Sequence, residues 1–106
     1  MNIEKGKLDF GVYIHELRSK HRYSLKIVAD KLGIDISLLS KIEHGERQLQ
    51  GHMLQPLAEL FVLDFKELQI QFLNQKIENE FGNEPYYFES LTTLVKKQKS
   101  SKVSNK

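Results

Sequence analysis

The sequence predicts an all-α fold, and three observations lead to this prediction. Apolar residues recur every three or four positions over most of the chain, which is the spacing of one face of an α-helix. Residues that begin and end helices well interrupt this pattern at helix-length intervals. The 106 residues, 40% of them hydrophobic and none of them cysteine, provide for one small core without disulfides.

The first helix is predicted over residues 9–20. Phe10, Ile14 and Leu17 have the spacing of an inward face. Cationic side chains gather near the C-terminal end of this helix, where they suit the helix dipole.

Residues 24–45, SLKIVADKLGIDISLLSKIEHG, predict two short helices joined by a tight turn. Ser24 is a good N-cap for the first of them, and Gly33 can adopt the left-handed conformation that ends it. The inward positions of the pair are apolar: Leu25, Val28, Ala29, Leu32, Leu38, Leu39 and Ile42. This layout is a helix-turn-helix, which is typical of DNA-binding proteins.

Further helices are predicted in the second half of the chain. One covers about residues 53–63 and has Pro56 in its first turn, where a missing N–H is tolerated. Asp64 is the expected N-cap of the next helix, and Glu67 completes an acidic capping-box pattern. Gly82 and Asn83 end that helix, and a last apolar helix follows Pro85.

The last two predicted helices carry more apolar residues than a small domain can bury. Leftover apolar surface usually marks a partner, and a homodimer is the simplest choice. The predicted dimer interface consists of Phe72, Leu73, Ile77, Phe81, Tyr87, Phe88 and Leu91. The aromatic residues 86–88 could instead stack on bases, but their acidic neighbours favour packing in a core or a dimer.

Charge is distributed unevenly along the chain. Residues 1–50 carry a net charge of +2, residues 51–90 of −5 and residues 91–106 of +5. Since phosphate repels an acidic surface, the N-terminal half is expected to face DNA. The basic end is predicted to be a solvated tail, with non-specific attraction to phosphate as the alternative.

Other classes of protein are not expected. No apolar run reaches the length of a membrane span and no leader is recognisable, so we expect a cytoplasmic protein without membrane contact. His15, His21, His44 and His52 lack the spacing of metal ligands and are expected at the surface or at helix ends. No phosphate-binding glycine loop or nucleophile–base grouping is recognisable, so no metal, cofactor or enzymatic activity is expected.

The segments ELR, VADKLGI and SLLSKIEHGER, within residues 10–67, resemble the lambda-repressor-like, or XRE-type, helix-turn-helix regulators of bacteria and phages. NEPYYFESL more weakly resembles small regulators of this family that accompany restriction-modification genes. The resemblance implies a lambda-repressor-like five-helix core plus a C-terminal helical extension. The expected boundaries are residues 8–66 for the DNA-binding domain, 67–98 for a dimerising extension and 99–106 for a disordered basic tail.

The resemblance also implies a homodimer that reads a partly palindromic operator in double-stranded DNA, with the third helix in the major groove. The positions that match the family's base-contacting residues are Asp35, Ile36, Ser37, Ser40 and Lys41. Many family members have glutamine where this chain has Leu25 and Ile36. The usual glutamine–adenine contact and the side-chain phosphate clamp are therefore not expected here.

Phosphate contacts are predicted beside this helix, from Arg22, Ser24, Lys26 and Arg47. Backbone N–H groups that follow Ser24 would assist them without needing a particular side chain. The alternative for each cation is an exposed, solvated charge. Arg18 and Glu43 match a family salt bridge between the first and third helices, and we expect them to form a structural pair.

The sequence therefore predicts a sequence-specific transcriptional regulator, acting as a repressor or autoregulator. The alternative is an antitoxin-like module whose C-terminal helices bind a partner protein. A stable homodimer would favour the first function, and obligate co-purification with another protein would favour the second.

Overall fold

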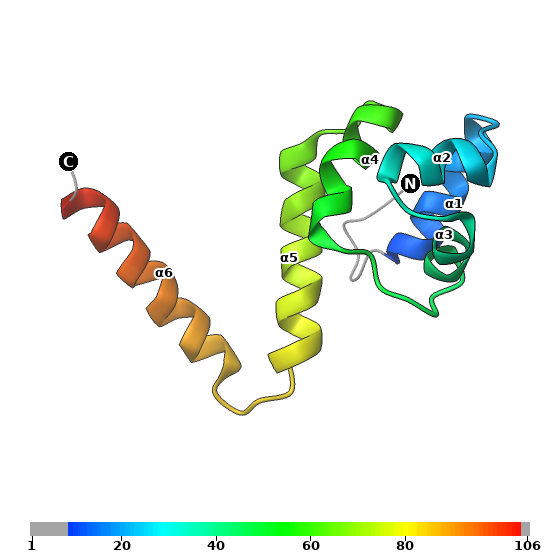
Figure 1. Cartoon of the computed structure of the whole chain (residues 1–106). Helices are drawn as coiled ribbons and strands as arrows, with labels where there is room; N and C mark the ends of the chain where they lie inside the picture. Colours follow the sequence, from blue (N-terminus) through cyan, green and yellow to red (C-terminus); the bar gives the residue numbers. More distant parts are fainter. Residues whose placement is uncertain (1–8, 105–106) are drawn as a thin grey trace. The chain divides into compact units, whose positions relative to one another are not determined.

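The computed structural model describes residues 9–104, with side chains through Ser100, and these residues form helices joined by turns (Figure 1). The helices are α1 (Phe10–Lys20), α2 (Leu25–Leu32), α3 (Ile36–Glu43), the 3₁₀ helix η1 (Gly51–Met53), α4 (Leu54–Phe61), α5 (Phe65–Phe81) and α6 (Tyr87–Ser104). No strand occurs among the described residues. The all-α prediction is confirmed.

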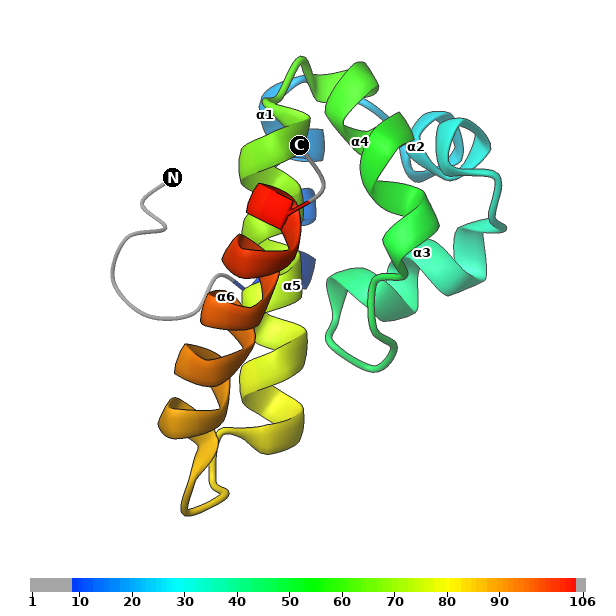
Figure 2. The ribbon, with the colours of Figure 1, turned by 90° about the vertical axis from the view of Figure 1, so that its left-hand side faces the viewer.

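The chain divides into two compact units, residues 1–75 and 76–106. The N-terminal unit holds α1 to α4 and the larger part of α5, and two views place α4 between α5 and the α2–α3 pair (Figures 1 and 2). The division falls later than the expected boundary at residue 66. The reason is that Leu68 and Phe72 of α5 belong to the core of the N-terminal unit.

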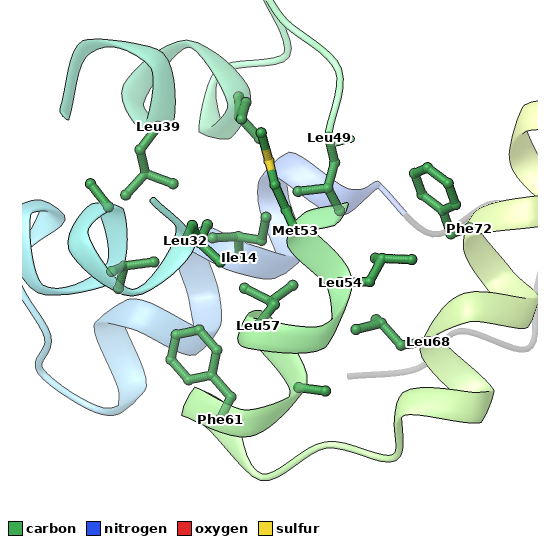
Figure 3. Close-up of a cluster of buried hydrophobic side chains, with 14 residues drawn as sticks. Ile14, Leu32, Leu39, Leu49, Met53, Leu54, Leu57, Phe61, Leu68 and Phe72 are labelled. Carbon is green, nitrogen blue, oxygen red and sulfur yellow. The ribbon is translucent and has the colours of Figure 1, made fainter. Parts of the chain in front are cut away.

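The core of the N-terminal unit is one cluster of apolar side chains from α1 to α5. Leu54 faces Leu68 and Phe72 across this cluster (Figure 3). Each fully buried side chain contributes about 1.5–3 kcal/mol relative to an exposed one. The core therefore holds α2 and α3 against α1 and α4. The side chains with 0% exposure are Ile14, Val28, Leu39 and Leu57.

Side-chain caps begin the first three helices, as their sequences favour. The carboxylate of Asp9 accepts the N–H of Val12 at 3.2 Å, and the hydroxyl of Ser24 accepts the N–H of Ile27 at 3.2 Å. The carboxylate of Asp35 accepts the N–H of Leu38 at 2.7 Å. Such a cap satisfies a donor that the helix itself leaves unpaired and typically contributes about 1 kcal/mol.

Gly33 ends α2 with φ of 73°, in the left-handed region that glycine adopts without steric cost. The N–H of Ile34 then donates to the carbonyl oxygen of Ala29 at 3.0 Å, which closes the helix end. The next helix begins at Ile36, so the turn between α2 and α3 is tight. The predicted helix-turn-helix is present.

The fourth and fifth helices follow the local signals in the sequence. The 3₁₀ helix η1 leads into α4, and Pro56 stands in the first turn of α4. Asp64 precedes α5, and its carboxylate accepts the N–H of Lys66 at 3.0 Å. The link between α4 and α5 contains Val62, whose φ of 54° is left-handed although its side chain is β-branched.

Phe72 differs from its predicted place. Its side chain is 9% exposed and packs edge-to-face on Phe10, with the ring centroids 6.2 Å apart. Assigning Phe72 to a dimer interface was wrong, because this ring completes the core of its own domain.

Helix α6 extends further than expected. It continues to Ser104, so residues 99–104, assigned from the sequence to a disordered tail, are helical, while residues 105–106 lie outside the described part. Lysine is a good helix former, which offsets the solvated character of this segment. Over residues 9–104, none of the helices is both long and apolar enough to span a bilayer.

Candidate nucleic-acid interface

The α2–turn–α3 segment presents one face of α3 outward and buries the other. Leu39, Ile42 and Glu43 are buried on the inner face of α3. Asp35, Ile36, Ser37 and Lys41 are exposed, and Ser40 is partly exposed. Positions 36, 37, 40 and 41 fall on one side of a helix because residues four apart lie one above the other. Four of the five predicted base-contacting residues thus share one accessible face, and the fifth stands at its N-terminal edge.

The chemistry of this face suits base edges in the major groove. A lysine can donate to the O6 and N7 atoms of guanine, serine can donate or accept, and an aliphatic side chain can contact a thymine methyl. Ile36 is 45% exposed, so its aliphatic side chain is accessible to a thymine methyl group. Its exposure is consistent with an apolar contact to DNA.

Asp35 has a structural role as well as a place at the edge of this face. Its Oδ1 atom accepts the N–H of Leu38 at 2.7 Å, which fixes the orientation of the carboxylate at the start of α3. A carboxylate accepts from the N4 amino group of cytosine, but it repels phosphate. Asp35 can therefore contact a base only from a pose that keeps it away from the DNA backbone.

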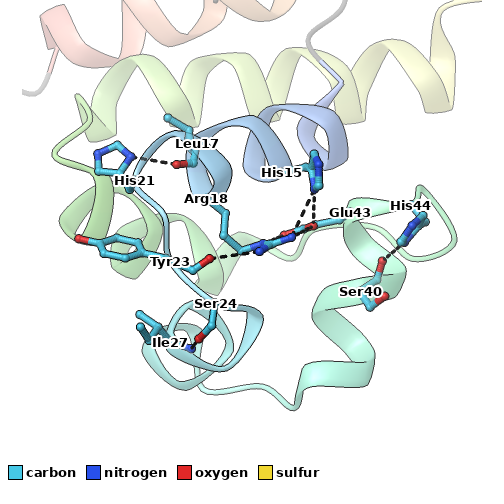
Figure 4. A network of polar contacts seen from close by, with 10 residues as sticks. All are labelled: His15, Leu17, Arg18, His21, Tyr23, Ser24, Ile27, Ser40, Glu43 and His44. Atoms are coloured by element: carbon cyan, nitrogen blue, oxygen red, sulfur yellow. Dashed lines mark hydrogen bonds and ion pairs between the residues drawn. The ribbon is translucent and has the colours of Figure 1, made fainter.

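A buried ion pair joins α1 to α3 (Figure 4). The Arg18 Nε atom donates to Glu43 Oε2 at 2.8 Å, and Arg18 Nη2 donates to Glu43 Oε1 at 3.1 Å. Arg18 Nη1 also donates to the carbonyl oxygen of Tyr23 at 3.1 Å, just before α2. The side chain of Glu43 is only 3% exposed. One guanidinium thus fixes α3 and the start of α2 to α1, which is the arrangement expected of the predicted structural pair.

His15 is a third member of this network, and sequence reasoning did not include it. Its Nδ1 atom lies 3.0 Å from Glu43 Oε1 and 3.4 Å from Arg18 Nη2. A single Nδ1 atom cannot donate to the carboxylate and accept from the guanidinium at once, and the shorter contact favours donation to Glu43. His15 stands one helical turn before Arg18, and this spacing was the signal that could have identified it.

The electrostatic state of Glu43 follows from these contacts. Burial raises the pKa of the Glu43 carboxyl, but hydrogen bonds from Arg18 and His15 and their charges more than offset burial, so the net pKa is lowered from 4.5. The hydrogen bond to Glu43 raises the pKa of Arg18. Both groups are therefore ionised at neutral pH, and a charged pair joins α1 to α3.

Two other histidines serve local structure. His21 Nδ1 lies 2.9 Å from the carbonyl oxygen of Leu17, and His44 Nδ1 lies 2.7 Å from that of Ser40 (Figure 4). The ring of His21 also packs edge-to-face on Phe61, at a centroid distance of 5.1 Å. Two of the four histidines thus cap helix ends.

The predicted phosphate contacts surround the helix-turn-helix. The hydroxyl of Ser24 is engaged as the cap of α2, which leaves its neighbouring backbone N–H groups at the helix start. Lys26 lies 3.1 Å from Asp30, but both side chains are more than half exposed, so a phosphate can compete for this lysine. Arg22 and Arg47 are exposed, on the turn before α2 and on the loop after α3.

The remaining predicted dimer residues are accessible. Leu73, Ile77 and Phe81 of α5 are 47%, 38% and 53% exposed. In α6, Phe88 is 74% exposed, and Tyr87 and Leu91 are partly exposed. The structure thus leaves apolar surface on both helices, although Phe72 is not part of it.

The fold and this geometry agree with the family comparison. A helix-turn-helix family model matches residues 14–68, more than half of the chain, and the match includes α2, α3 and the Arg18–Glu43 pair. Searches of curated proteins and of solved structures find no match. The chain belongs to the helix-turn-helix family of DNA-binding regulators, of the lambda-repressor-like (XRE) type predicted from its sequence.

Proposed function

We propose that the protein represses transcription, its own included, by binding a partly palindromic operator as a homodimer. The observation that carries this proposal is the outward face of α3, where Ile36, Ser37 and Lys41 are exposed. The inner face of the same helix is buried and is held by the ion pair of Glu43. A rigid helix with a mixed polar and apolar face matches the pattern of donors, acceptors and methyl groups in the major groove.

The base contacts in this proposal come from Ile36, Ser37, Ser40 and Lys41, with Asp35 at the edge. The phosphate contacts come from Arg22, Lys26, Arg47 and the backbone at Ser24. Phosphate contacts set the register on the duplex, and base contacts select the sequence. Two copies related by a two-fold axis would read half-sites about 34 Å apart, which is one turn of DNA.

The first test is a footprint on the DNA upstream of the protein's own gene, with random DNA as competitor and at two salt concentrations. A protected pair of half-sites, bound about a thousandfold more tightly than random DNA, is the expected result. Weak binding without a preferred site, which disappears as salt rises, would overturn the proposal.

A matched pair of variants tests the assignment of α3. Ser37→Ala with Lys41→Ala should weaken operator binding by about 1–3 kcal/mol for each base contact that is removed, without changing the oligomeric state. Lys66→Ala removes an exposed lysine at the start of α5 and should leave operator binding unchanged. If both variants bind as the wild type does, α3 is not the recognition helix.

The antitoxin-like alternative would give a different result in the same preparation. A protein that co-purifies in fixed ratio with this chain, and dissociates when the apolar residues of α6 are replaced, would indicate that α6 binds another protein.

A further inference from the structure

Helix α6 presents an uncovered apolar face. Within the part of the C-terminal unit whose side chains are described, residues 76–100, no residue is buried. Phe88, Leu94 and Val95 are 74%, 54% and 55% exposed. With Tyr87 and Leu91 they share one side of the helix, because positions 87, 88, 91, 94 and 95 have the spacing of a single helical face.

The opposite side of α6 is polar, and the two threonines of this helix form hydrogen bonds within it. The hydroxyl of Thr93 donates to the carbonyl oxygen of Glu89 at 2.6 Å, and the hydroxyl of Thr92 donates to that of Phe88 at 3.1 Å. In proteins, most of the stability of a helix comes from the packing of its apolar face. The apolar face, and not the polar one, therefore needs a partner.

Charge is strongly polarised along this part of the chain. The acidic residues Glu84 and Glu89 lie just before and within the first turn of α6, whereas Lys96, Lys97 and Lys99 occupy its second half. In a parallel pair, the helix dipoles would not compensate for repulsion between like charges, because parallel dipoles repel each other as well. Two parallel helices would place each lysine cluster beside the same cluster of the other copy.

We propose that α6 pairs with α6 of a second copy in antiparallel orientation, with the two-fold axis near Leu91. About this axis the apolar residues map onto one another: Tyr87 lies level with Val95 of the second copy, Phe88 with Leu94, and Leu91 with itself. The same operation brings Lys96, Lys97 and Lys99 beside the acidic start of the partner helix. The apolar pattern thus fits the antiparallel arrangement, and charge is self-complementary only in that arrangement.

This inference rests on the homodimer of the proposed function and adds its interface and orientation. A second copy is favoured over a foreign partner because one helix supplies both halves of the complementary charge and a palindromic apolar pattern. An antiparallel two-fold pair needs that property, and a surface made for another protein does not.

Single cysteines test the orientation cleanly, because the chain has no cysteine of its own. Under mild oxidation, Leu91→Cys should form a disulfide-linked dimer, since the two copies of this position meet at the axis. Gln98→Cys should not, because its two copies would be separated by about 21 Å along the helices, whereas a disulfide needs Cα atoms within about 7 Å. Cross-linking of both variants would indicate parallel helices and overturn the proposal.

A mixture of two other single-cysteine variants controls for a local effect of replacing Leu91. Tyr87→Cys and Val95→Cys, oxidised together in the full-length protein, should form the mixed disulfide in preference to either homodimer. Absence of the mixed product would also overturn the antiparallel arrangement.

Sedimentation of the unmodified protein separates this proposal from the one on which it rests. A dimer that binds its operator but gives none of these cross-links would leave the proposed function standing and refute the α6 interface. A monomer that binds a single half-site would refute the dimer in both proposals.

Discussion

The Glu43 carboxylate connects the stability of the domain to pH. Its pKa is lowered in the folded protein, so the stabilisation is fully present above the ordinary value of 4.5 and is lost as pH falls through the lowered folded value. Glu43→Gln leaves the buried Arg18 without its counter-charge, and we expect it to reduce the free energy of unfolding by about 3 kcal/mol at pH 7. Urea unfolding at pH 7 and at pH 3 measures the effect.

The difference between wild type and Glu43→Gln should shrink at the lower pH, because the wild-type carboxyl is then increasingly protonated. Glu59→Gln is the control, since Glu59 pairs with Lys31 at 3.1 Å but both side chains are well exposed, so little change is expected. An equal cost for Glu43→Gln at both pH values would contradict the electrostatic account.

Val62 holds a conformation that its side chain disfavours. It has φ of 54° and is 89% exposed, so burial of apolar surface does not compensate for the strain of the left-handed conformation. Val62→Gly should raise the free energy of unfolding by about 0.5–1 kcal/mol, because the strain relieved exceeds the chain entropy that glycine adds. Chemical denaturation measures this gain.

A second exposed valine provides the comparison for Val62. Val12 lies within α1 and is 42% exposed, so Val12→Gly should destabilise the protein. If glycine lowers the free energy of unfolding at both positions, relief of the strain at Val62 does not exceed the chain entropy that glycine adds.

At the scale of elements, the crossing of α1 and α3 depends on a missing side chain. A methyl group at Gly11 would overlap the backbone carbonyl oxygens of Ile42 and Glu43. Backbone cannot yield as a flexible side chain can, so Gly11→Ala should push α3 away from α1. We expect a loss of about 1–3 kcal/mol in stability and weaker operator binding, measured by urea unfolding and by titration of the DNA.

Gly51→Ala is the matched control for Gly11→Ala. A methyl group at Gly51 would meet only the Phe72 ring, at an ordinary contact distance of 3.7 Å. This variant should keep both stability and DNA affinity close to those of the wild type. Wild-type behaviour of Gly11→Ala would mean that the α1–α3 crossing tolerates a wider spacing.

The elements that local chemistry decides were predictable from the sequence. Ser24, Gly33 and Asp64 act through hydrogen bonds or dihedral angles within a few residues, and the structure has a helix end at each of them. Phe72 was misplaced because the apolar face of α5 is wide, and its sequence does not indicate which residues of that face pack in the core of the same domain. His15 was missed because its partner, Glu43, is 28 residues away in sequence.

The face of α3 was predictable for a related reason. Once the inward positions of α3 are recognised, helical periodicity leaves Ser37, Ser40 and Lys41 to face outward, whereas Ile36 was assigned from the family resemblance. Periodicity did not reveal that the Asp35 carboxylate is held by the Leu38 N–H, since capping geometry depends on the backbone at the helix start.

At the scale of the whole molecule, the operator affinity of the proposed homodimer should depend on the linkage between its two DNA-binding domains. Binding of one domain raises the effective concentration of the second at its half-site, which is worth about 10²–10⁴-fold in affinity. Leu91→Asp places a charge on the apolar face of α6 and should convert the dimer to a monomer. Its affinity for a two-half-site duplex should then fall by at least about 100-fold.

Affinity for a duplex with a single half-site measures DNA binding by one domain without the contribution of dimerisation. Leu91→Asp should bind this shorter duplex as the wild-type domain does, because α6 lies outside the unit that contains α3. Thr93→Asp introduces the same charge on the polar side of α6 and should leave both duplexes bound with normal affinity. Full-site affinity that survives Leu91→Asp would mean that the operator recruits each domain independently, and that α6 has no part in DNA recognition.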